Sequence, residues 1–166
     1  SGVMVTGSHN PPEFNGFKIC VGPDTIYGDE IQALRAIIEK GSFRSGSGED
    51  SSLDISKAYL DYIYENVKVR PGLRVILDGG NGVGGTFAVP LFERFGCELH
   101  GLNVDMDGRF PNHHPDPTVP ENLRDLIVQV RQKKADVGIA FDGDADRIGV
   151  VTDQGDILWG DELLLL

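Results

Sequence analysis

The sequence predicts an α/β protein with mixed, mostly parallel sheets and helices on both faces of the sheet. The first observation is that short apolar runs alternate with amphipathic segments from residue 73 onward, in the order strand, helix, strand, helix, strand. This order is typical of a parallel sheet with crossover helices. The second observation is a polar stretch rich in Gly and Ser at residues 41–52, which separates this region from an earlier strand and helix segment.

The N-terminal part is expected to contain two strands and one helix. Residues 3–5 are an apolar run that predicts a buried strand, and the Gly, Ser, His, Asn and Pro residues after it predict an irregular loop. A second strand is expected at 17–21. Apolar residues with helical spacing predict a helix over 29–40, and Gly41 is a natural stop.

The rest of the chain carries the alternating elements and ends in a predicted hairpin. We expect a domain boundary near residues 50–55, so the predicted domains are 1–53, 54–159 and a short segment, 160–166, that begins a third domain. The expected elements are helices at 54–66, 83–95 and 121–134, and strands at 73–77, 98–104, 137–141, 148–152 and 157–159.

Composition excludes several classes of partner. The net charge of −11 argues against nucleic acid and against an anionic membrane. No apolar run approaches the roughly 18 residues that span a bilayer.

Two distant cysteines, Cys20 and Cys97, are expected to be buried thiols in a reducing, cytoplasmic compartment. The chain does not begin with Met and opens directly on a strand, so we expect it to be part of a longer protein.

Three aspartates alternate with small residues directly after a predicted strand, at Asp142, Asp144 and Asp146. Such a turn can converge three carboxylate oxygens on one hard cation, and Mg²⁺ with open positions for phosphate fits best. Ca²⁺ in an EF-hand is disfavoured because the later glutamate of that loop is missing. A solvated acidic turn is the plain alternative. Arg147 can hold a phosphate or pair with the acids.

Ser8 is the candidate nucleophile. It lies between Gly7 and His9 on the loop after the first strand, where small neighbours let a ligand approach. The plain alternative is a turn or cap serine. A reactive serine and a magnesium site in one chain suggest phosphoryl chemistry.

Two further motifs have structural alternatives that we favour. Residues 80–85 match the G-x-G-x-x-G pattern of dinucleotide-binding loops, but Asp78 stands where an apolar strand end is expected, so a tight turn is the preferred interpretation. His113 and His114 resemble a metal-ligand pair, but histidines in a Pro-rich loop are more often structural.

Taken together, the motifs make the chain similar to the α-D-phosphohexomutases, and within them to the bacterial phosphomannomutase/phosphoglucomutase branch. The resemblance extends along essentially all of the chain. It is carried by Thr6-Gly7-Ser8-His9-Asn10-Pro11, Asn15-Gly16-Phe17-Lys18-Ile19, Asp78-Gly79-Gly80-Asn81-Gly82, Pro111-Asn112-His113-His114-Pro115-Asp116-Pro117 and Asp142-Gly143-Asp144-Ala145-Asp146-Arg147.

The resemblance implies phosphoglucomutase-like domains and an isomerase that interconverts hexose 1-phosphates and 6-phosphates. It implies that Ser8 is carried as phosphoserine and donates its phosphoryl group to a glucose or mannose phosphate through a 1,6-bisphosphate. It also implies that Lys18 lies near the reacting hydroxyl and that His9, Asn10 and Arg147 contact phosphate. The implied Mg²⁺ ligands are Asp142, Asp144, Asp146 and a phosphate oxygen on Ser8.

Members of this family have four domains, and the chain resembles the end of the first, the whole second and the start of the third. We therefore expect the remaining domains of a parent enzyme to supply the cationic half of the site, and the isolated chain to lack mutase activity. Two alternatives stay open. One is a haloacid-dehalogenase-type phosphotransferase with Asp142 as nucleophile and Asp144 as acid, and the other is a non-catalytic metal- or dinucleotide-binding module.

Overall fold

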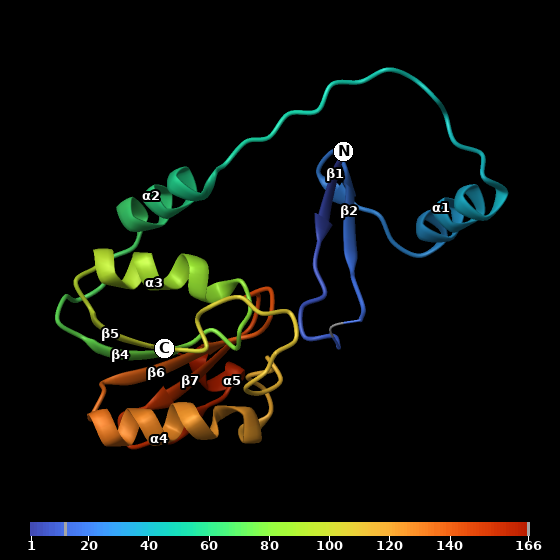
Figure 1. Ribbon diagram of the computed structural model, residues 1–166. Helices are drawn as coiled ribbons and strands as arrows, with labels where there is room; N and C mark the ends of the chain where they lie inside the picture. The colour runs from blue at the N-terminus through green and yellow to red at the C-terminus, as the bar shows by residue number, and fades with distance from the viewer. Residues whose placement is uncertain (12, 166) are drawn as a thin grey trace. The chain divides into compact units, whose positions relative to one another are not determined.

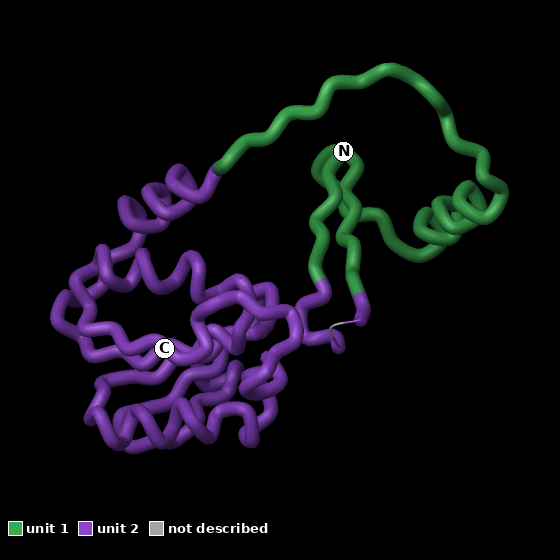
Figure 2. Tube along the Cα trace, in the orientation of Figure 1, with its two compact units in different colours: residues 1–6, 15–54 green, residues 7–14, 55–166 purple. Residues whose placement is uncertain are grey.

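The computed structural model describes residues 1–11 and 13–165. Pro12 of the serine motif and Leu166 of the predicted 160–166 segment lie outside the described residues. The chain divides into two compact units, one of residues 1–6 and 15–54 and one of residues 7–14 and 55–166 (Figure 2). The predicted division at residues 53/54 and 159/160 stays a prediction about domains.

The first unit contains a three-stranded antiparallel sheet and one helix. Strands β1 (Gly2–Val5), β2 (Phe17–Val21) and β3 (Asp24–Thr25) pair in that order, and helix α1 (Asp29–Lys40) has the predicted bounds. The prediction that residues 3–5 are buried is wrong, because Val3 and Val5 are 60% and 66% exposed. An apolar run predicts a strand, but its burial needs a covering layer, and β1 is an edge strand.

The second unit is built on a five-stranded mixed sheet in the order β5-β4-β6-β7-β8. Its strands are β4 (Arg74–Asp78), β5 (Glu98–Leu102), β6 (Val137–Phe141), β7 (Ile148–Thr152) and β8 (Ile157–Leu158). β5, β4 and β6 are parallel, and β7 and β8 are antiparallel. The α/β class with mixed sheets is confirmed. The expectation of mostly parallel pairing holds only for β5, β4 and β6, because the hairpin and the first sheet are antiparallel.

Helices cover both faces of this sheet, as predicted. α2 (Ser56–Asn66) packs on α3 (Gly84–Arg94), which lies on one face, and α4 (Arg124–Lys133) lies on the other (Figure 1). A short 3₁₀ turn, Pro120–Leu123, precedes α4, and α5 (Gly160–Leu163) follows the hairpin. Strand β5 ends two residues earlier than expected, because Asn103 adopts a left-handed conformation with φ 50° that no extended strand accommodates.

The best-buried core lies between α4 and the sheet. Leu126 and Val130 of α4 are fully buried against Ile76 and Val151. Gly138 of β6 makes room for this helix, since a Cβ there would lie 2.7 Å from a Val130 methyl group. This packing fixes the sheet and, with it, the loops at the carboxyl ends of its parallel strands.

Two smaller expectations can be compared with the structure. Both cysteines are free, but Cys20 and Cys97 are only partly buried, so the expectation of buried thiols is not met. Among the helices of the described residues, none has both the length and the apolar character that a bilayer crossing requires.

Candidate active site

The candidate site lies where parallel strands β4, β5 and β6 end at the same edge of the sheet. The acidic loop (residues 142–147) follows β6, and the glycine loop (79–85) follows β4. The serine loop (residues 7–11 and 13–14) also belongs to this unit. Ligands of open α/β sheets bind at such an edge, so these loops form the candidate active site.

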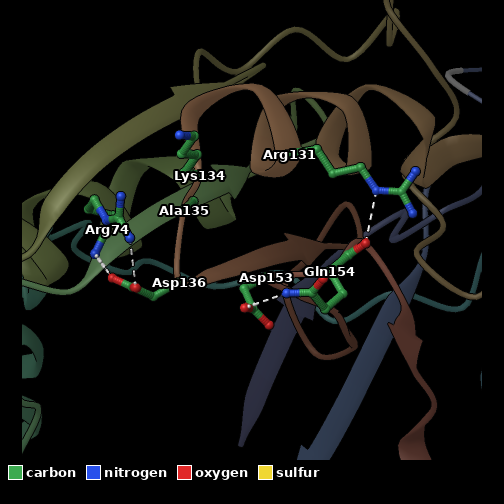
Figure 3. A pocket seen from close by; sticks show the side chains of 7 residues that line it. All are labelled: Arg74, Arg131, Lys134, Ala135, Asp136, Asp153 and Gln154. Atoms are coloured by element: carbon green, nitrogen blue, oxygen red, sulfur yellow. Dashed lines mark hydrogen bonds and ion pairs between the residues drawn. The ribbon is translucent and has the colours of Figure 1, made fainter.

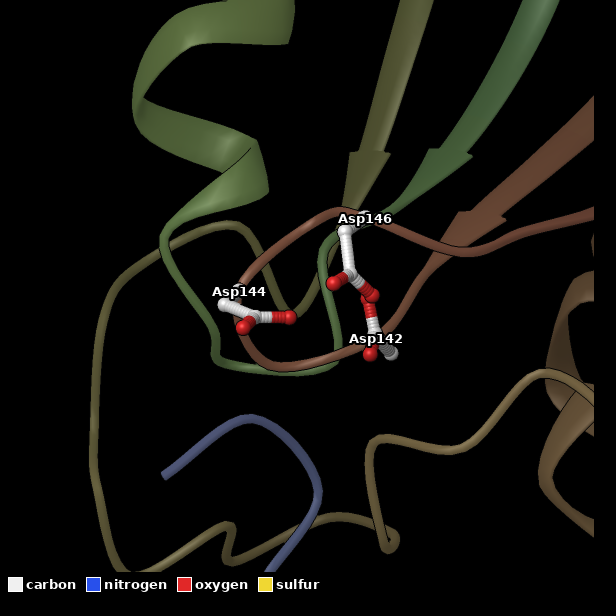
Figure 4. Close-up of side chains that lie close together, drawn as sticks. All are labelled: Asp142, Asp144 and Asp146. Atoms are coloured by element: carbon white, nitrogen blue, oxygen red, sulfur yellow. The ribbon is translucent and has the colours of Figure 1, made fainter. Parts of the chain in front are cut away.

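The acidic loop gathers three carboxylates in a small space. Asp142 is fully buried, whereas Asp144 is partly exposed and Asp146 is exposed. One oxygen from each lies within 4.8 Å of the others (Figure 4). Ala145 turns the loop through a left-handed conformation with φ 61°. Three hard oxygen donors in this arrangement can hold a divalent cation.

The Ser8 hydroxyl lies directly against this cluster. Its Oγ is 2.8 Å from Oδ2 of Asp142 and 2.9 Å from Oδ1 of Asp144, and it is 3.2 Å from Nδ1 of His9. A serine hydroxyl carries one proton, so it cannot donate to both carboxylates at once. The carboxylate that does not receive the proton faces a lone pair of the Ser8 oxygen, and the two oxygens repel each other. A bound cation would remove that repulsion. The donor set therefore fits a metal ion next to Ser8.

The backbone around Ser8 is strained and tightly stacked. Ser8 has φ 48°, in the left-handed region that residues other than Gly rarely adopt. A Cβ on Gly143 would overlap the carbonyl oxygen of Ser8, and a Cβ on Gly82 would lie 2.6 Å from the carbonyl oxygen of Gly143. The N–H of Val83 donates to that same carbonyl. Three loops therefore stack backbone on backbone and hold Ser8 in place.

Arg147 connects the acidic loop to His9. Its Nη2 lies 2.7 Å from Nδ1 of His9, and its Nε lies 3.7 Å from Oδ2 of Asp142. Because a guanidinium only donates, Nδ1 of His9 accepts this hydrogen bond. The backbone N–H of Arg147 also donates to Oδ1 of Asp142. The structure thus brings together Ser8, His9, Arg147 and the three aspartates, all within one unit.

Lys18 and Asn10 are the other two residues that the sequence singles out. Lys18 lies on β2 in the first unit, exposed and opposite Met4 in the sheet register. Asn10 is exposed on the serine loop, where its backbone N–H donates to the carbonyl of Gly7. Their predicted roles stay predictions.

The glycine loop packs inside the protein, which supports the tight-turn interpretation over dinucleotide binding. Gly82 faces Gly143, and a Cβ on Gly85 would overlap the carbonyl of Val104. Asn81 makes two side-chain bonds with neighbouring loops: its Nδ2 donates to the carbonyl of Asp105, and its Oδ1 accepts from Asn112. The space that a pyrophosphate needs at these glycines is filled by protein.

His113 is structural, as the sequence favoured. Its Nε2 lies 3.0 Å from Oδ2 of Asp78, which is fully buried, and its Nδ1 lies 3.0 Å from the carbonyl oxygen of His114. The hydrogen bond with Asp78 raises the pKa of His113 above its usual value, although burial acts in the opposite direction. Asp78 also accepts from the N–H of Gly80 and from Asn103, so it ties the loops together.

Asp116 lies in the Pro-rich motif at 111–117, and its residue type and position in the sequence predicted no role for it. The structure places its Oδ1 3.9 Å from Nη1 of Arg147. Burial alone would raise the pKa of Asp116, but hydrogen bonds from Thr118 and the charge of Arg147 bring it below its ordinary value. The signal available in the sequence is an acid enclosed by two prolines, Pro115 and Pro117, in a loop that has to be rigid.

A polar hollow of about 380 Å³ lies around the start of β4 and the end of α4 (Figure 3). Its cations have structural partners: Arg74 pairs with Asp136, and Nε of Arg131 donates to the carbonyl of Gln154. Lys134 and Arg131 also lie near the helix C-terminus, where positive charge is favoured. This hollow therefore needs no ligand to account for its charges.

Comparison with known proteins gives consistent matches. The model of the phosphoglucomutase/phosphomannomutase α/β/α domain I matches residues 1–45, and that of domain II matches residues 57–155. A phosphoglucomutase of Neisseria gonorrhoeae is 51% identical over 168 residues, and a phosphomannomutase/phosphoglucomutase of Pseudomonas aeruginosa is 51% identical over 166. Each alignment covers 100% of this chain and 36% of the relative.

A solved structure gives the same match in three dimensions. The crystal structure of a phosphoglucomutase/phosphomannomutase family protein from Burkholderia thailandensis superposes with a TM-score of 0.90 at 48% identity. It covers 96% of this chain and 35% of that one. The chain therefore spans about a third of the length of the proteins it matches.

Proposed function

Because this chain belongs to the phosphoglucomutase/phosphomannomutase family, we propose that it carries the phosphorylated serine and the metal-binding half of a phosphohexomutase. The enzyme would interconvert hexose 1-phosphates and 6-phosphates, with glucose or mannose phosphates as substrates. The observation that carries this proposal is the position of Ser8, whose Oγ lies within hydrogen-bond distance of two aspartates of the acidic loop.

In the proposed reaction Ser8 carries a phosphoryl group. The bond between phosphorus and Oγ of Ser8 breaks as a new bond forms to the free hydroxyl of a hexose monophosphate. That hydroxyl loses its proton, and Oγ regains one. The resulting 1,6-bisphosphate returns its other phosphoryl group to Ser8 by the same step in reverse. Phosphoryl transfer of this kind depends mainly on positioning and on neutralisation of charge.

The charges around Ser8 explain why a cation belongs to the proposal. A phosphoserine adds about −1.5 to −2 charge beside Asp142 and Asp144. Asp142, Asp144 and Asp146 are the residues that would hold Mg²⁺, together with an oxygen of the phosphoserine. When bound, Mg²⁺ would neutralise the phosphoryl group and orient it.

The remaining residues have proposed roles that follow from their contacts. Arg147 donates to His9, the neighbour of Ser8, and its own backbone N–H donates to Asp142. His9 accepts from Arg147 and would contact phosphate, as would Asn10. Lys18 is the proposed proton carrier or electrostatic stabiliser for the substrate hydroxyl. Because the chain spans about a third of its relatives, we propose that further domains supply the hexose-recognising surface.

The haloacid-dehalogenase alternative has less support. Asp142 would have to act as the nucleophile there, but it is fully buried and its Oδ2 lies against Ser8. The two proposals also predict different phosphoenzymes, because an aspartyl phosphate is cleaved by hydroxylamine and a phosphoserine is not.

Assays of the full-length protein test the proposal. Glucose 1-phosphate and mannose 1-phosphate are each incubated with the wild type and with Ser8→Ala, and the 6-phosphates are measured. We expect Ser8→Ala to lower kcat by about 10³-fold or more, with an unchanged circular dichroism spectrum. Ser51→Ala, in the exposed segment between α1 and α2, is the matched control. Retention of most of the activity by Ser8→Ala would overturn the proposal.

A further inference from the structure

Asp116 is held more rigidly than an ordinary loop residue. Both neighbours, Pro115 and Pro117, are buried. Pro115 packs against Gly80, where an added Cβ would lie 3.0 Å from the proline ring, and Pro117 packs against Gly149 at 2.9 Å by the same measure. Since proline also fixes φ, the backbone that carries Asp116 has little freedom.

The carboxylate of Asp116 is fixed as well. Its Oδ1 accepts from the backbone N–H of Thr118 at 3.0 Å and from Thr118 Oγ1 at 2.6 Å. Its backbone carbonyl accepts from the side chain of Asn122. The Asp116 side chain is only 15% exposed. A negative charge is therefore held at a defined point facing Arg147.

Arg147, in contrast, is not fixed by burial. Its side chain is 38% exposed, and a long side chain of this kind has many rotamers. Three groups surround its guanidinium: His9 at Nη2, Asp142 at Nε and Asp116 at Nη1. Asp142 and Asp116 attract it through different nitrogen atoms, Nε and Nη1.

The contact between Arg147 and Asp142 involves one carboxylate oxygen, Oδ2. Oδ2 of Asp142 lies 3.7 Å from Nε of Arg147, and this same oxygen accepts from Ser8. If the guanidinium moved onto Oδ2, it would occupy an oxygen that a cation beside Ser8 requires. The charge of Asp116 opposes that movement.

We propose that Asp116 is a positioning residue for Arg147: it competes with Asp142 for the guanidinium and so keeps Oδ2 of Asp142 open to the cation and to the group on Ser8. The inference rests on the proposed function for its effect on turnover. Its effect on cation binding can be measured without turnover.

The experiment is a double-mutant cycle in the full-length protein, with Mg²⁺ affinity measured by calorimetry and turnover measured separately. We expect Asp116→Asn to weaken Mg²⁺ binding by about tenfold, as loss of an orienting outer residue commonly does, and to lower kcat more than it changes KM for the hexose phosphate. In an Arg147→Met background, where no guanidinium competes for Asp142, Asp116→Asn should have no further effect on Mg²⁺ affinity. Asp153→Asn, which removes one exposed carboxylate, is the control.

Each outcome decides the proposal. Equal weakening of Mg²⁺ binding in both backgrounds would mean that Asp116 acts through the fold, and it would overturn the inference, as would unchanged binding in Asp116→Asn. If Asp116→Asn does not fold, Thr118→Ala removes one bond to Oδ1 and should weaken Mg²⁺ binding in the same direction, again only when Arg147 is present. If Mg²⁺ binding follows the expected pattern in the cycle but the wild type shows no mutase turnover, the proposed function is wrong and the inference about Asp116 stands.

Discussion

Oγ of Ser8 lies 2.8 Å from Oδ2 of Asp142, although 134 positions separate the two residues in the chain. Asp142 is fully buried at the end of β6, and Ser8 adopts a left-handed backbone conformation on a separate loop. Strain of this kind persists only where the surrounding structure holds it. The candidate nucleophile and the acidic cluster therefore form one site within the second unit.

Gly143→Ala tests the backbone stack that holds Ser8. The new methyl group would overlap the Ser8 carbonyl, so the serine loop has to move away from the acidic loop. We expect turnover by the full-length protein to fall by about 10²-fold, since a displacement near 1 Å has that effect on well-positioned chemistry. Gly108→Ala is the matched control, because a Cβ there has no neighbour within 4 Å. Equal activity in both variants would contradict the proposed role of the stack.

Asp144→Asn tests the acidic loop as a cation site. We expect Mg²⁺ to raise the thermal unfolding temperature of the wild type, with a stabilisation of about 2.7 kcal/mol at a concentration 100 times Kd. Removal of one donor should weaken binding by about tenfold or more and reduce this shift. Without Mg²⁺ the variant should be at least as stable as the wild type, because one repulsive charge is gone. If Mg²⁺ raises the unfolding temperature of Asp144→Asn as much as that of Asp153→Asn, the acidic loop is not the cation site.

His113→Gln tests the buried pair with Asp78. Because the pair raises the pKa of His113 above 6.5, its contribution to stability is complete below that pH and is lost as pH rises through the raised pKa. Urea unfolding from about pH 6 to about pH 9 should show the variant less stable than the wild type at low pH, with the difference shrinking as pH rises. Ser51→Ala, which changes an exposed residue with no ionisable group, is the control. A difference that grows with pH would contradict the assignment.

Lys18→Gln tests the proposed role of Lys18. If Lys18 carries a proton or stabilises charge at the substrate hydroxyl, kcat of the full-length protein should fall by about 10²- to 10⁴-fold with a smaller change in KM. Lys57→Gln is the control, because it removes an exposed lysine that pairs with Asp61 along a helix. A rise in KM with kcat unchanged would assign Lys18 to substrate binding instead.

The sequence was a good guide to local structure. Helix α1 and strands β2, β6 and β7 have the predicted bounds, because apolar periodicity and turn residues such as Gly155, with φ 83°, act over a few residues. Exposure of Val3 and Val5 was not predictable, because burial depends on what covers a strand. The sequence predicted mostly parallel sheets and so underestimated the number of antiparallel strand pairs, although it did predict the hairpin.

The residues that cluster around Ser8 could be named from the sequence, but the residues that support them could not. Ser8 and the three aspartates stand out by residue type and spacing. The roles of Asp78 and Asp116 do not, because each acts through partners on other loops: His113 for Asp78, and Arg147 for Asp116. Such contacts arise only once the sheet brings the loops to one edge.

Locating the phosphoryl group on the full-length protein tests the proposed phosphoserine directly. The protein is labelled with radioactive hexose 1,6-bisphosphate, mapped by peptide mass spectrometry and then chased with unlabelled hexose monophosphate. We expect hydroxylamine-stable label on the peptide that contains Ser8, and its transfer to the sugar as a bisphosphate. Label on Asp142, or label on Ser8 that the sugar phosphate does not remove, would contradict it.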